Sequence, residues 1–405
     1  MERGRKKDKK TQAWGNNRGE VTDGLAEVSG KQREGGQILR QSGRNYGLDL
    51  LRMVSMFLIV NLHVLGQGGA MVRIAGNEST YYAAWFLETC AYCAVDCYGL
   101  LSGYVGVKGK PRLGRFLELW LQVFFYSAGI TLVYYLAALQ FLTGESFWQA
   151  VFPVCAKTYW YFSAYAGLFF LMPYLNRMVL ALEERERKRL AAVLFFVFSV
   201  ATAIPKAAGT DFLSLVGGYS FAWLLILYLF GACLGTCTFR RWKLWKYGAA
   251  YLGLSAFSWI FKILVENYTR SMYGEAMFGR VFTGYAAPTM FLCAVCLLLL
   301  FEGLKIKGEW LCRLIKAASP LAFSVYIIHT HPLVWESLMK GAFSSYRYLH
   351  WAALLPAVLL SAVLIYTVCS LIDLLRKKLF DILDIRKRCQ GASDALGCWW
   401  SKKRI

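Results

Sequence analysis

Ten long apolar blocks, separated by short polar segments, organise most of this chain. They lie at residues 47–66, 82–106, 114–138, 159–181, 190–205, 219–238, 245–265, 285–303, 316–337 and 351–375. A helix of about 20 apolar residues crosses the roughly 30 Å core of a bilayer. Apolar side chains fill the blocks and do not follow one stripe, which is typical of membrane helices. The pattern predicts an all-α, polytopic membrane protein with ten spanning helices, of which the fifth is the shortest.

The polar segments between the blocks differ in charge. Lys and Arg concentrate in one set, which includes "KGKPRLGR", "EERERKR", "RRWKLWK" and "RKKLFDILDIRKR". The alternate set, which includes "GGAMVRIAGNEST", "QFLTGES" and "KAAGTDF", carries few of them. Because basic loops tend to stay in the cytoplasm, ten crossings place both termini there. We expect a disordered basic cytoplasmic tail at 1–45, a transmembrane domain at 46–375 and a basic cytoplasmic tail at 376–405.

The composition narrows the class of partner. Of the 405 residues, 57% are hydrophobic and only 18% are charged, which is too little polar surface for a soluble domain of this size. The net charge of +21 would suggest nucleic acid in a soluble protein. Here the basic residues sit between apolar blocks, so we expect contact with membrane lipid and none with nucleic acid.

Most of the twelve cysteines lie inside apolar blocks, where cysteine behaves as a small hydrophobic residue. The pairs Cys90–Cys93 and Cys293–Cys296 have CxxC spacing, but each falls within a predicted spanning helix. Neither a second pair nor a histidine cluster completes a zinc site. We therefore expect no metal.

The first apolar block carries Arg52 and His63, although a charge near the centre of a spanning helix costs about 2.5–3.5 kcal/mol. Eleven residues of helix turn about 20° past three full turns, so both side chains share one stripe, about 16 Å apart. Ionisable residues in membranes usually face the interior or a water-filled cavity. We expect both to line one channel, with Arg52 toward the cytoplasm and His63 toward the outside.

The second block contributes two carboxylates. Read as one continuous helix, it places Asp96 about 21 Å from the outer end, level with Arg52. An Arg52–Asp96 pair would lower the cost of burying either charge. Glu88 falls near the level of His63, where it would orient or polarise the imidazole.

The end of the second block predicts a donor site. Ser102-Gly103 interrupts the apolar run, and Gly106, Gly109 and Pro111 follow, so we expect irregular backbone over this segment, lining a cavity. Arg112 and Arg115 follow on one face of the next helix. Two arginines beside a Gly-rich bend suit a phosphate-bearing ligand, because guanidinium groups bind phosphate through charge-assisted hydrogen bonds.

The outer ends of two further blocks carry aromatic and histidine residues. Trp160 and Tyr161 open the fourth block, where aromatic faces suit a sugar ring. His329 and His331 lie near the outer end of the ninth block, at about the level of His63. Residues two apart on a helix diverge by roughly 200°, which argues against a shared metal. His331 precedes Pro332, so we expect the helix to be disturbed there.

These motifs, in this order, resemble the acyltransferase-3 family of membrane acyltransferases over about residues 46–375. The resemblance is carried by five segments: "LDLLRMVSMFLIVNLH", "LLSGYV", "RLGR", "YWYFSAYAGLFFLMPYLN" and "FSVYIIHTHPLVW". Members move an acyl group from cytoplasmic acyl-coenzyme A to an extracytoplasmic acceptor, often a sugar hydroxyl of a cell-surface glycan. The resemblance implies an O-acyltransferase, with acetyl-CoA as the expected donor, no permanently bound cofactor and a multi-pass position in a bacterial plasma membrane.

The resemblance also implies roles for individual residues. His63 would be the catalytic histidine, and we place Glu88 beside it as a second catalytic residue. We expect the donor to be bound by Arg52, Arg112, Arg115, Ser102 and Gly103. Acceptor binding falls to Asp96, Trp160, Tyr326 and His329. The second histidine of the ninth-block motif, His331, departs from the family pattern and receives no role.

Two other functions stay open from the sequence. A transporter or exporter of a small molecule or glycan intermediate would also use buried ionisable residues, although no internal repeat of the kind seen in many carriers is evident. The helical domain is also compatible with a membrane module of a racemase or sensor. Neither the acceptor's identity nor the oligomeric state can be inferred from the sequence.

Overall fold

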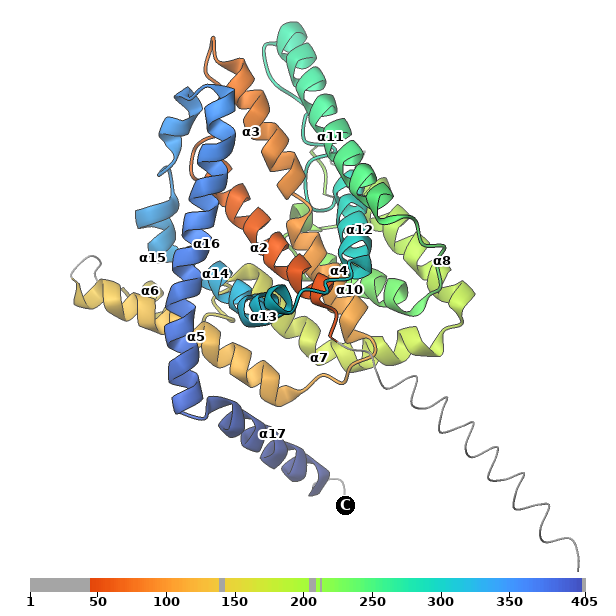
Figure 1. The fold of residues 1–405 in the computed structure, drawn as a ribbon, viewed down its shortest axis with the longest axis vertical. Helices are drawn as coiled ribbons and strands as arrows, with labels where there is room; N and C mark the ends of the chain where they lie inside the picture. Colours follow the sequence, from red (N-terminus) through yellow and green to blue (C-terminus); the bar gives the residue numbers. More distant parts are fainter. Residues whose placement is uncertain (1–43, 138–142, 204–208, 212, 403–405) are drawn as a thin grey trace, which may run out of the picture. The chain divides into compact units, whose positions relative to one another are not determined.

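The computed structural model describes residues 44–137, 143–203, 209–211 and 213–402 (Figure 1). The expected tail at 1–45 lies outside these residues except for its last two. Contacts divide the chain into 1–45 and Tyr46–Ile405, and only the second unit is considered below. Within the described part of this unit, helices form the structure and no β-strand is present, which confirms the all-α class.

The helices follow the apolar blocks. Their bounds are α2 Tyr46–Leu65, α3 Glu78–Ala91, α4 Ala94–Gly106, α5 Leu113–Leu136, α6 Gly144–Val151, α7 Trp160–Ala181, α8 Glu184–Phe195, α10 Phe221–Thr236, α11 Leu244–Tyr273, α12 Pro288–Gly303, α13 Glu309–Ala318, α14 Ala322–His329, α15 Pro332–Val334, α16 Trp351–Ile382 and α17 Ile385–Lys402. Short π-helical segments η1 Phe196–Val200 and η4 Trp335–Met339 extend α8 and α15. Short 3-10 segments are η2 Val216–Gly218, η3 Ser319–Leu321 and η5 Ser344–Tyr348.

Each of the ten predicted blocks contains helix. Among the residues that the structure describes, six helical stretches are long and apolar enough to cross a membrane, and α10 and α12 are shorter apolar helices. This supports a polytopic membrane protein, while the number of crossings and the side on which the termini lie stay predictions. The last block is longer than expected, because α16 continues to Ile382 before α17 begins.

Two blocks are broken where the sequence suggested one helix. The second divides into α3 and α4 at Tyr92 and Cys93. In the ninth block, α14 ends at His329. The backbone is extended at His331 (ψ 132°), as expected for the residue before Pro332. The irregular backbone expected from Ser102 to Pro111 is found only after Gly106, where α4 ends; Ser102 and Gly103 lie inside regular α4.

Glycines let α4 pack closely against α10 at this place. A side chain at Gly103 would meet the Tyr228 carbonyl oxygen of α10, and one at Gly231 would meet the Leu100 carbonyl of α4. Of the described helix pairs, α4 and α10 have the most extensive contact. Small residues allow two backbones to approach this closely in membrane bundles. Gly103 is therefore a residue of helix packing.

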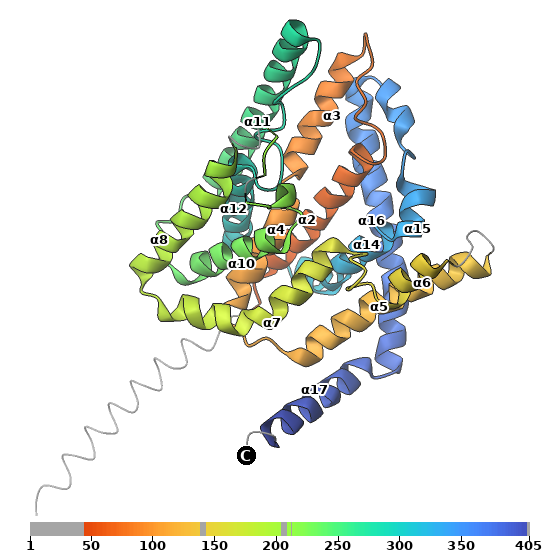
Figure 2. The same ribbon diagram turned by 180° about the vertical axis from the view of Figure 1, so that it is seen from behind.

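Helix α2 lies inside the bundle. It contacts α3, α4, α12, α14 and α16, and two opposite views both place it between α16 and α12 (Figures 1 and 2). Most of its side chains are buried, including its polar Asp49 and Asn61. Any ionisable side chain on α2 therefore faces neighbouring helices or a cavity between them.

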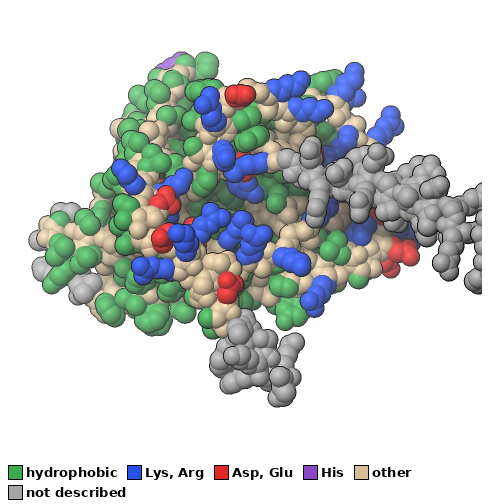
Figure 3. Space-filling view, turned by 60° about the horizontal axis from the view of Figure 1, so that its bottom comes forward, with side chains coloured by type: hydrophobic (Ala, Val, Ile, Leu, Met, Phe, Trp, Pro, Cys, Tyr) green, Lys and Arg blue, Asp and Glu red, His purple; other side chains and the backbone are tan. Residues whose placement is uncertain are grey.

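Lys and Arg gather on one face, at the bottom of the view in Figure 1, where α17 and the beginning of α5 lie (Figure 3). Helix α17 packs against α5, with Cys389 and Gln390 touching Gly114. Arg112 and Arg115 flank Gly114 and are exposed. This end corresponds to the predicted cytoplasmic side.

Candidate functional site

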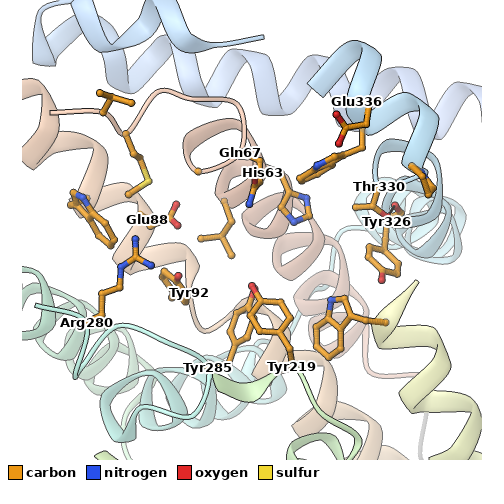
Figure 4. Close-up of a pocket in the computed structure, with 18 of the residues that line it drawn as sticks. His63, Gln67, Glu88, Tyr92, Tyr219, Arg280, Tyr285, Tyr326, Thr330 and Glu336 are labelled. Atoms are coloured by element: carbon orange, nitrogen blue, oxygen red, sulfur yellow. Dashed lines mark hydrogen bonds between the residues drawn. The ribbon is translucent and has the colours of Figure 1, made fainter. Parts of the chain in front are cut away.

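Two cavities meet at His63. The larger, of about 780 Å³, lies at the C-terminal end of α2 and is called here the outer cavity (Figure 4). Its wall includes His63, Gln67, Glu88, Trp160, Arg280 and Tyr326. The smaller, of about 60 Å³, is called the inner cavity. Its wall includes Met56, Ile59, His63, Tyr98, Tyr161 and Phe323.

His63 is held by a second histidine. Its Nδ1 lies 2.8 Å from Nε2 of His329, and the edge of its ring meets Trp335 at a centroid distance of 4.9 Å and an interplanar angle of 90°. Nδ1 of His329 lies 2.5 Å from the carbonyl oxygen of Val325. Because a carbonyl only accepts, His329 carries its proton on Nδ1 and, when neutral, leaves Nε2 bare.

This chain of hydrogen bonds decides the tautomer of His63. With Nε2 of His329 as acceptor, Nδ1 of His63 must be the donor. Nε2 of a neutral His63 is then unprotonated and available as a base. His329 is 1% exposed and lies behind His63, so the structure places it against the base and outside the cavity walls. We expected His329 to contact substrate, but it lines neither cavity.

The expectation that Arg52 and His63 both line one channel holds for His63 but not for Arg52, which lines neither cavity. Met56, Ile59 and His63 follow one another at helical spacing, and all three line the inner cavity. Arg52 lies one turn before Met56, and its carbonyl oxygen accepts a hydrogen bond from the Tyr98 hydroxyl at 2.7 Å. Tyr98 also lines this cavity. The inner cavity thus runs along α2 from His63 toward the level of Arg52.

The predicted Arg52–Asp96 pair is wrong. Nη1 of Arg52 lies 2.5 Å from Oδ1 of Asp49, three residues earlier on the same helix. Asp96 is fully buried and accepts a hydrogen bond from Nε1 of Trp223 at 2.9 Å. The predicted depth of Asp96 assumed one continuous helix. Because the helix breaks at Tyr92 and Cys93, that depth is wrong. Asp96 lines neither cavity.

Glu88 lines the outer cavity but does not hold His63. It is 6% exposed, and its Oε2 has no hydrogen-bond partner among the described residues. Figure 4 shows the carboxylate facing into the cavity, with the Arg280 guanidinium directed toward it. The position beside the imidazole that was expected for Glu88 is occupied by His329. A catalytic role for Glu88 stays a prediction.

Aromatic rings form the wall that the two cavities share. Trp160, Tyr219, Tyr285 and Tyr326 line both. Trp160 and Tyr219 have centroids 5.0 Å apart, and Tyr219 and Tyr285 4.9 Å apart. Trp160 and Tyr326 therefore lie beside both cavities, and their acceptor-binding role stays a prediction. Tyr161 lines only the inner cavity.

Sequence reasoning missed Tyr219, Tyr285, Arg280 and Trp335. The first two follow a glycine shortly before a helix begins, in "VGGYS" and "FTGYAAP". Gly218 has φ 100°, and a side chain there would overlap Tyr285. A glycine–tyrosine pair before a helix start was the available signal. Nothing in the sequence marked Arg280 or Trp335.

The expected donor residues fall at different places. Ser102 donates to the Tyr98 carbonyl at 2.8 Å, and neither Ser102 nor Gly103 lines a cavity. Arg112 and Arg115 stand at the start of α5, whereas Thr131 of the same helix is 3.4 Å from His331. About 16 residues of helix separate these levels by roughly 24 Å. The arginine pair thus lies at the opposite end of the bundle from the histidines.

His331 and His329 have different neighbours, as the spacing predicted. Nε2 of His331 donates to the Ser127 carbonyl at 3.2 Å, and its Nδ1 accepts from the Leu333 N–H at 3.2 Å, capping α15. His331 is thereby occupied in holding the turn after α14 against α5. No group of three potential metal ligands occurs within the residues that the structure describes.

Comparison with known proteins identifies the family of the chain. A family model described as an acyltransferase domain, Acyl_transf_3, matches residues 45–372. The match covers most of the chain, from α2 into α16, and includes both histidines of the pair; α17 lies beyond it. Searches among curated proteins and among solved structures returned no match. The chain therefore belongs to the acyltransferase-3 family of membrane acyltransferases.

Proposed function

We propose that this acyltransferase moves an acyl group, with acetyl as the first donor to test, from cytoplasmic acyl-CoA to a hydroxyl of an extracytoplasmic or lipid-linked carbohydrate. The observation that carries the proposal is the position of His63. Its ring stands where a narrow cavity from one side meets a wide cavity from the other, and its Nε2 is left free by the bond to His329.

The chemistry requires one base and one acid, and His63 supplies both in turn. Nε2 takes the proton of the acceptor hydroxyl while the oxygen attacks the thioester carbonyl. A carbon–oxygen bond forms, the carbon–sulfur bond breaks, and the departing thiolate takes the proton from the imidazolium. General acid–base catalysis of this kind contributes about 10²–10⁴-fold.

His329 acts through His63 as a positioning residue. By accepting from Nδ1, it holds the imidazole in the tautomer that exposes Nε2. It also accepts a stronger, charge-assisted hydrogen bond when His63 becomes an imidazolium. The Val325 carbonyl holds His329 in turn.

The donor is proposed to enter from the basic face. Arg112 and Arg115 are exposed there and suit the phosphates of coenzyme A. The thin arm of the donor would follow the α2 stripe through the inner cavity, past Arg52, and deliver the thioester to His63.

The acceptor is proposed to occupy the outer cavity. Its volume falls within the range of about 300–1,000 Å³ that is usual for small-molecule sites. Tyr219, Tyr285 and Trp160 offer aromatic faces to a sugar ring, and Glu88 and Gln67 offer hydrogen-bonding groups to its hydroxyls.

The test is thioester cleavage by the purified full chain in liposomes supplied with radiolabelled acetyl-CoA and a glycan extract. We expect release of coenzyme A and label in the glycan, and loss of at least about 10²-fold in rate in His63→Ala. His350→Asn is the control, because His350 is exposed and only caps α16, a role that Asn also fills. Label that crosses the membrane with its thioester intact would support a transporter and contradict the proposal.

A further inference from the structure

We infer that the outer cavity selects an anionic carbohydrate, with Arg280 binding an oxyanion of the acceptor (a phosphate or a carboxylate) and Glu88 accepting a hydroxyl or amide hydrogen of the same sugar unit. The inference rests on the proposed function for the reaction that follows binding. The site itself stands on the charges around the cavity.

Charges in the outer cavity are not all neutralised within the protein. Glu336 is paired with Lys340 at 2.8 Å. Arg280 is exposed, lies 5.5 Å from the Trp85 ring centroid and forms no hydrogen bond or ion pair with another described side chain. Its guanidinium is free to bind an oxyanion in a bidentate manner, for which its planar donor geometry is suited.

The nearest other carboxylate is already used. Glu266 is ion-paired with Lys262 and accepts a hydrogen bond from the Tyr81 hydroxyl at 2.9 Å. Lys262 is fully buried, and its ammonium lies 3.6 Å from the Trp85 ring centroid. Trp85 therefore has Lys262 and Arg280 near it. Glu266 is ion-paired with Lys262, whereas the Arg280 guanidinium is directed toward Glu88 without forming an ion pair with it.

The backbone holds Arg280 at this place. A side chain at the preceding Gly279 would overlap the Glu266 carboxylate, so only glycine lets the segment pass directly over this ion pair. Thr269 anchors the same segment by accepting a hydrogen bond from the Met277 N–H at 2.9 Å. Arg280 is thus presented to the cavity by a supported loop.

Glu88 provides the complementary acceptor. Its carboxylate lines the cavity, and its buried Oε2 has no hydrogen-bond partner among the described residues, so the group has acceptor capacity that the protein does not use. Figure 4 shows Glu88 and Arg280 on the same wall, beside Tyr92. A ligand with a hydrogen-bond donor next to an oxyanion satisfies both groups, whereas a neutral sugar offers Arg280 only uncharged acceptors, which form weaker hydrogen bonds.

The experiment measures binding and turnover separately. Equilibrium binding to the purified chain in nanodiscs is measured for three radiolabelled glycosides of one sugar: neutral, uronic acid and phosphate ester. We expect an anionic glycoside to bind at least about 10-fold more tightly than the neutral one, as for a hydrogen bond to a charged group. The two anionic arms distinguish carboxylate from phosphate.

Variants locate the effect. Arg280→Gln should remove the preference for the anionic glycoside, and Arg280→Lys should restore part of it. Arg270→Gln is the matched control, because Arg270 is an exposed arginine on α11 that does not line the cavity. Equal binding of neutral and anionic glycosides, or a preference that survives in Arg280→Gln, would overturn the inference.

Failure of the proposed function has a different signature. His63→Ala should retain the binding preference while losing release of coenzyme A. If the wild-type chain binds anionic glycosides selectively but never cleaves acyl-CoA, the proposed transfer is wrong and the anionic carbohydrate site stands.

Discussion

A chain of two hydrogen bonds determines which ring nitrogen of His63 and of His329 carries a proton. The Val325 carbonyl decides where His329 carries its proton, and His329 decides where His63 carries its own. The tautomer of His63 is therefore determined by a residue more than 260 positions away in the sequence. A carboxylate in the place of His329 would form an ion pair with the imidazolium, whereas a neutral histidine orients the ring without adding a charge.

Removing this acceptor should lower turnover more than binding. We expect His329→Leu to reduce kcat by at least about 10-fold, with little change in KM for either substrate, because only the orientation of His63 is lost. His329→Gln should recover part of kcat, since its amide oxygen can accept from Nδ1. Steady-state kinetics measure both. A rise in KM without loss of kcat would instead indicate that His329 contacts substrate.

Asp96 offers a second test at this scale. Trp223→Phe removes the single hydrogen bond that the structure gives the Asp96 carboxylate, and we expect a loss of about 1–3 kcal/mol in stability. Thermal unfolding in detergent should show that Asp96→Asn and Trp223→Phe are not additive, whereas Asp96→Asn and Arg52→Gln are. Non-additive effects of Asp96→Asn and Arg52→Gln would instead indicate that these two residues interact, contrary to the structure. Trp245→Phe, at an exposed position, is the control.

At the scale of elements, the junction of α3 and α4 shapes the site. The chain lines the outer cavity at Glu88 and Tyr92, breaks its helix at Tyr92 and Cys93, and continues as a helix packed closely on α10. The Ser-Gly segment that resembled a ligand-binding bend is instead the contact surface between these two helices. Because α10 follows directly on Tyr219, this contact also positions one wall of both cavities.

Enlarging the glycine at this contact should destabilise the bundle. Gly103→Ala forces a methyl group against the Tyr228 carbonyl, and overpacking of this kind costs about 1–3 kcal/mol. Gly129→Ala is the matched control, because Gly129 also lies inside a helix but has no neighbour within 4 Å of the place that an added methyl group would take. It should be neutral or slightly stabilising. Equal melting temperatures for the two variants would contradict the close contact.

At the scale of the whole transmembrane unit, the two substrates are expected at opposite ends. The arginine pair of α5 lies on the basic face and Arg280 lines the outer cavity, with His63 between them along the cavities. Under the proposed function, this separation would let one histidine serve a cytoplasmic donor and an extracytoplasmic acceptor.

The separation predicts independent effects on the two substrates. Arg112→Gln with Arg115→Gln should raise KM for acetyl-CoA by about 10-fold or more and leave the acceptor KM unchanged. Arg280→Gln should do the reverse, so each variant is the control for the other. Initial rates with each substrate varied in turn measure both constants. A rise of both KM values in either variant would mean that the two ends are not independent.

The sequence by itself determined the helices, the stripe on α2 and the distribution of basic segments. These features are local: the length of an apolar run, the helical repeat between Met56, Ile59 and His63, and the charge of each loop need no knowledge of neighbouring helices. The break at His331 was also readable, because Pro332 acts on the adjacent residue.

Only the tertiary structure decided which side chains meet. Asp49 took the place expected for Asp96, and His329 the place expected for Glu88, because pairing depends on the depth and rotation of each helix. One break in a helix changes both for every residue beyond it. The outer cavity joins Glu88, Tyr219 and Arg280 from segments far apart in the chain, and no period within a single helix encodes that meeting.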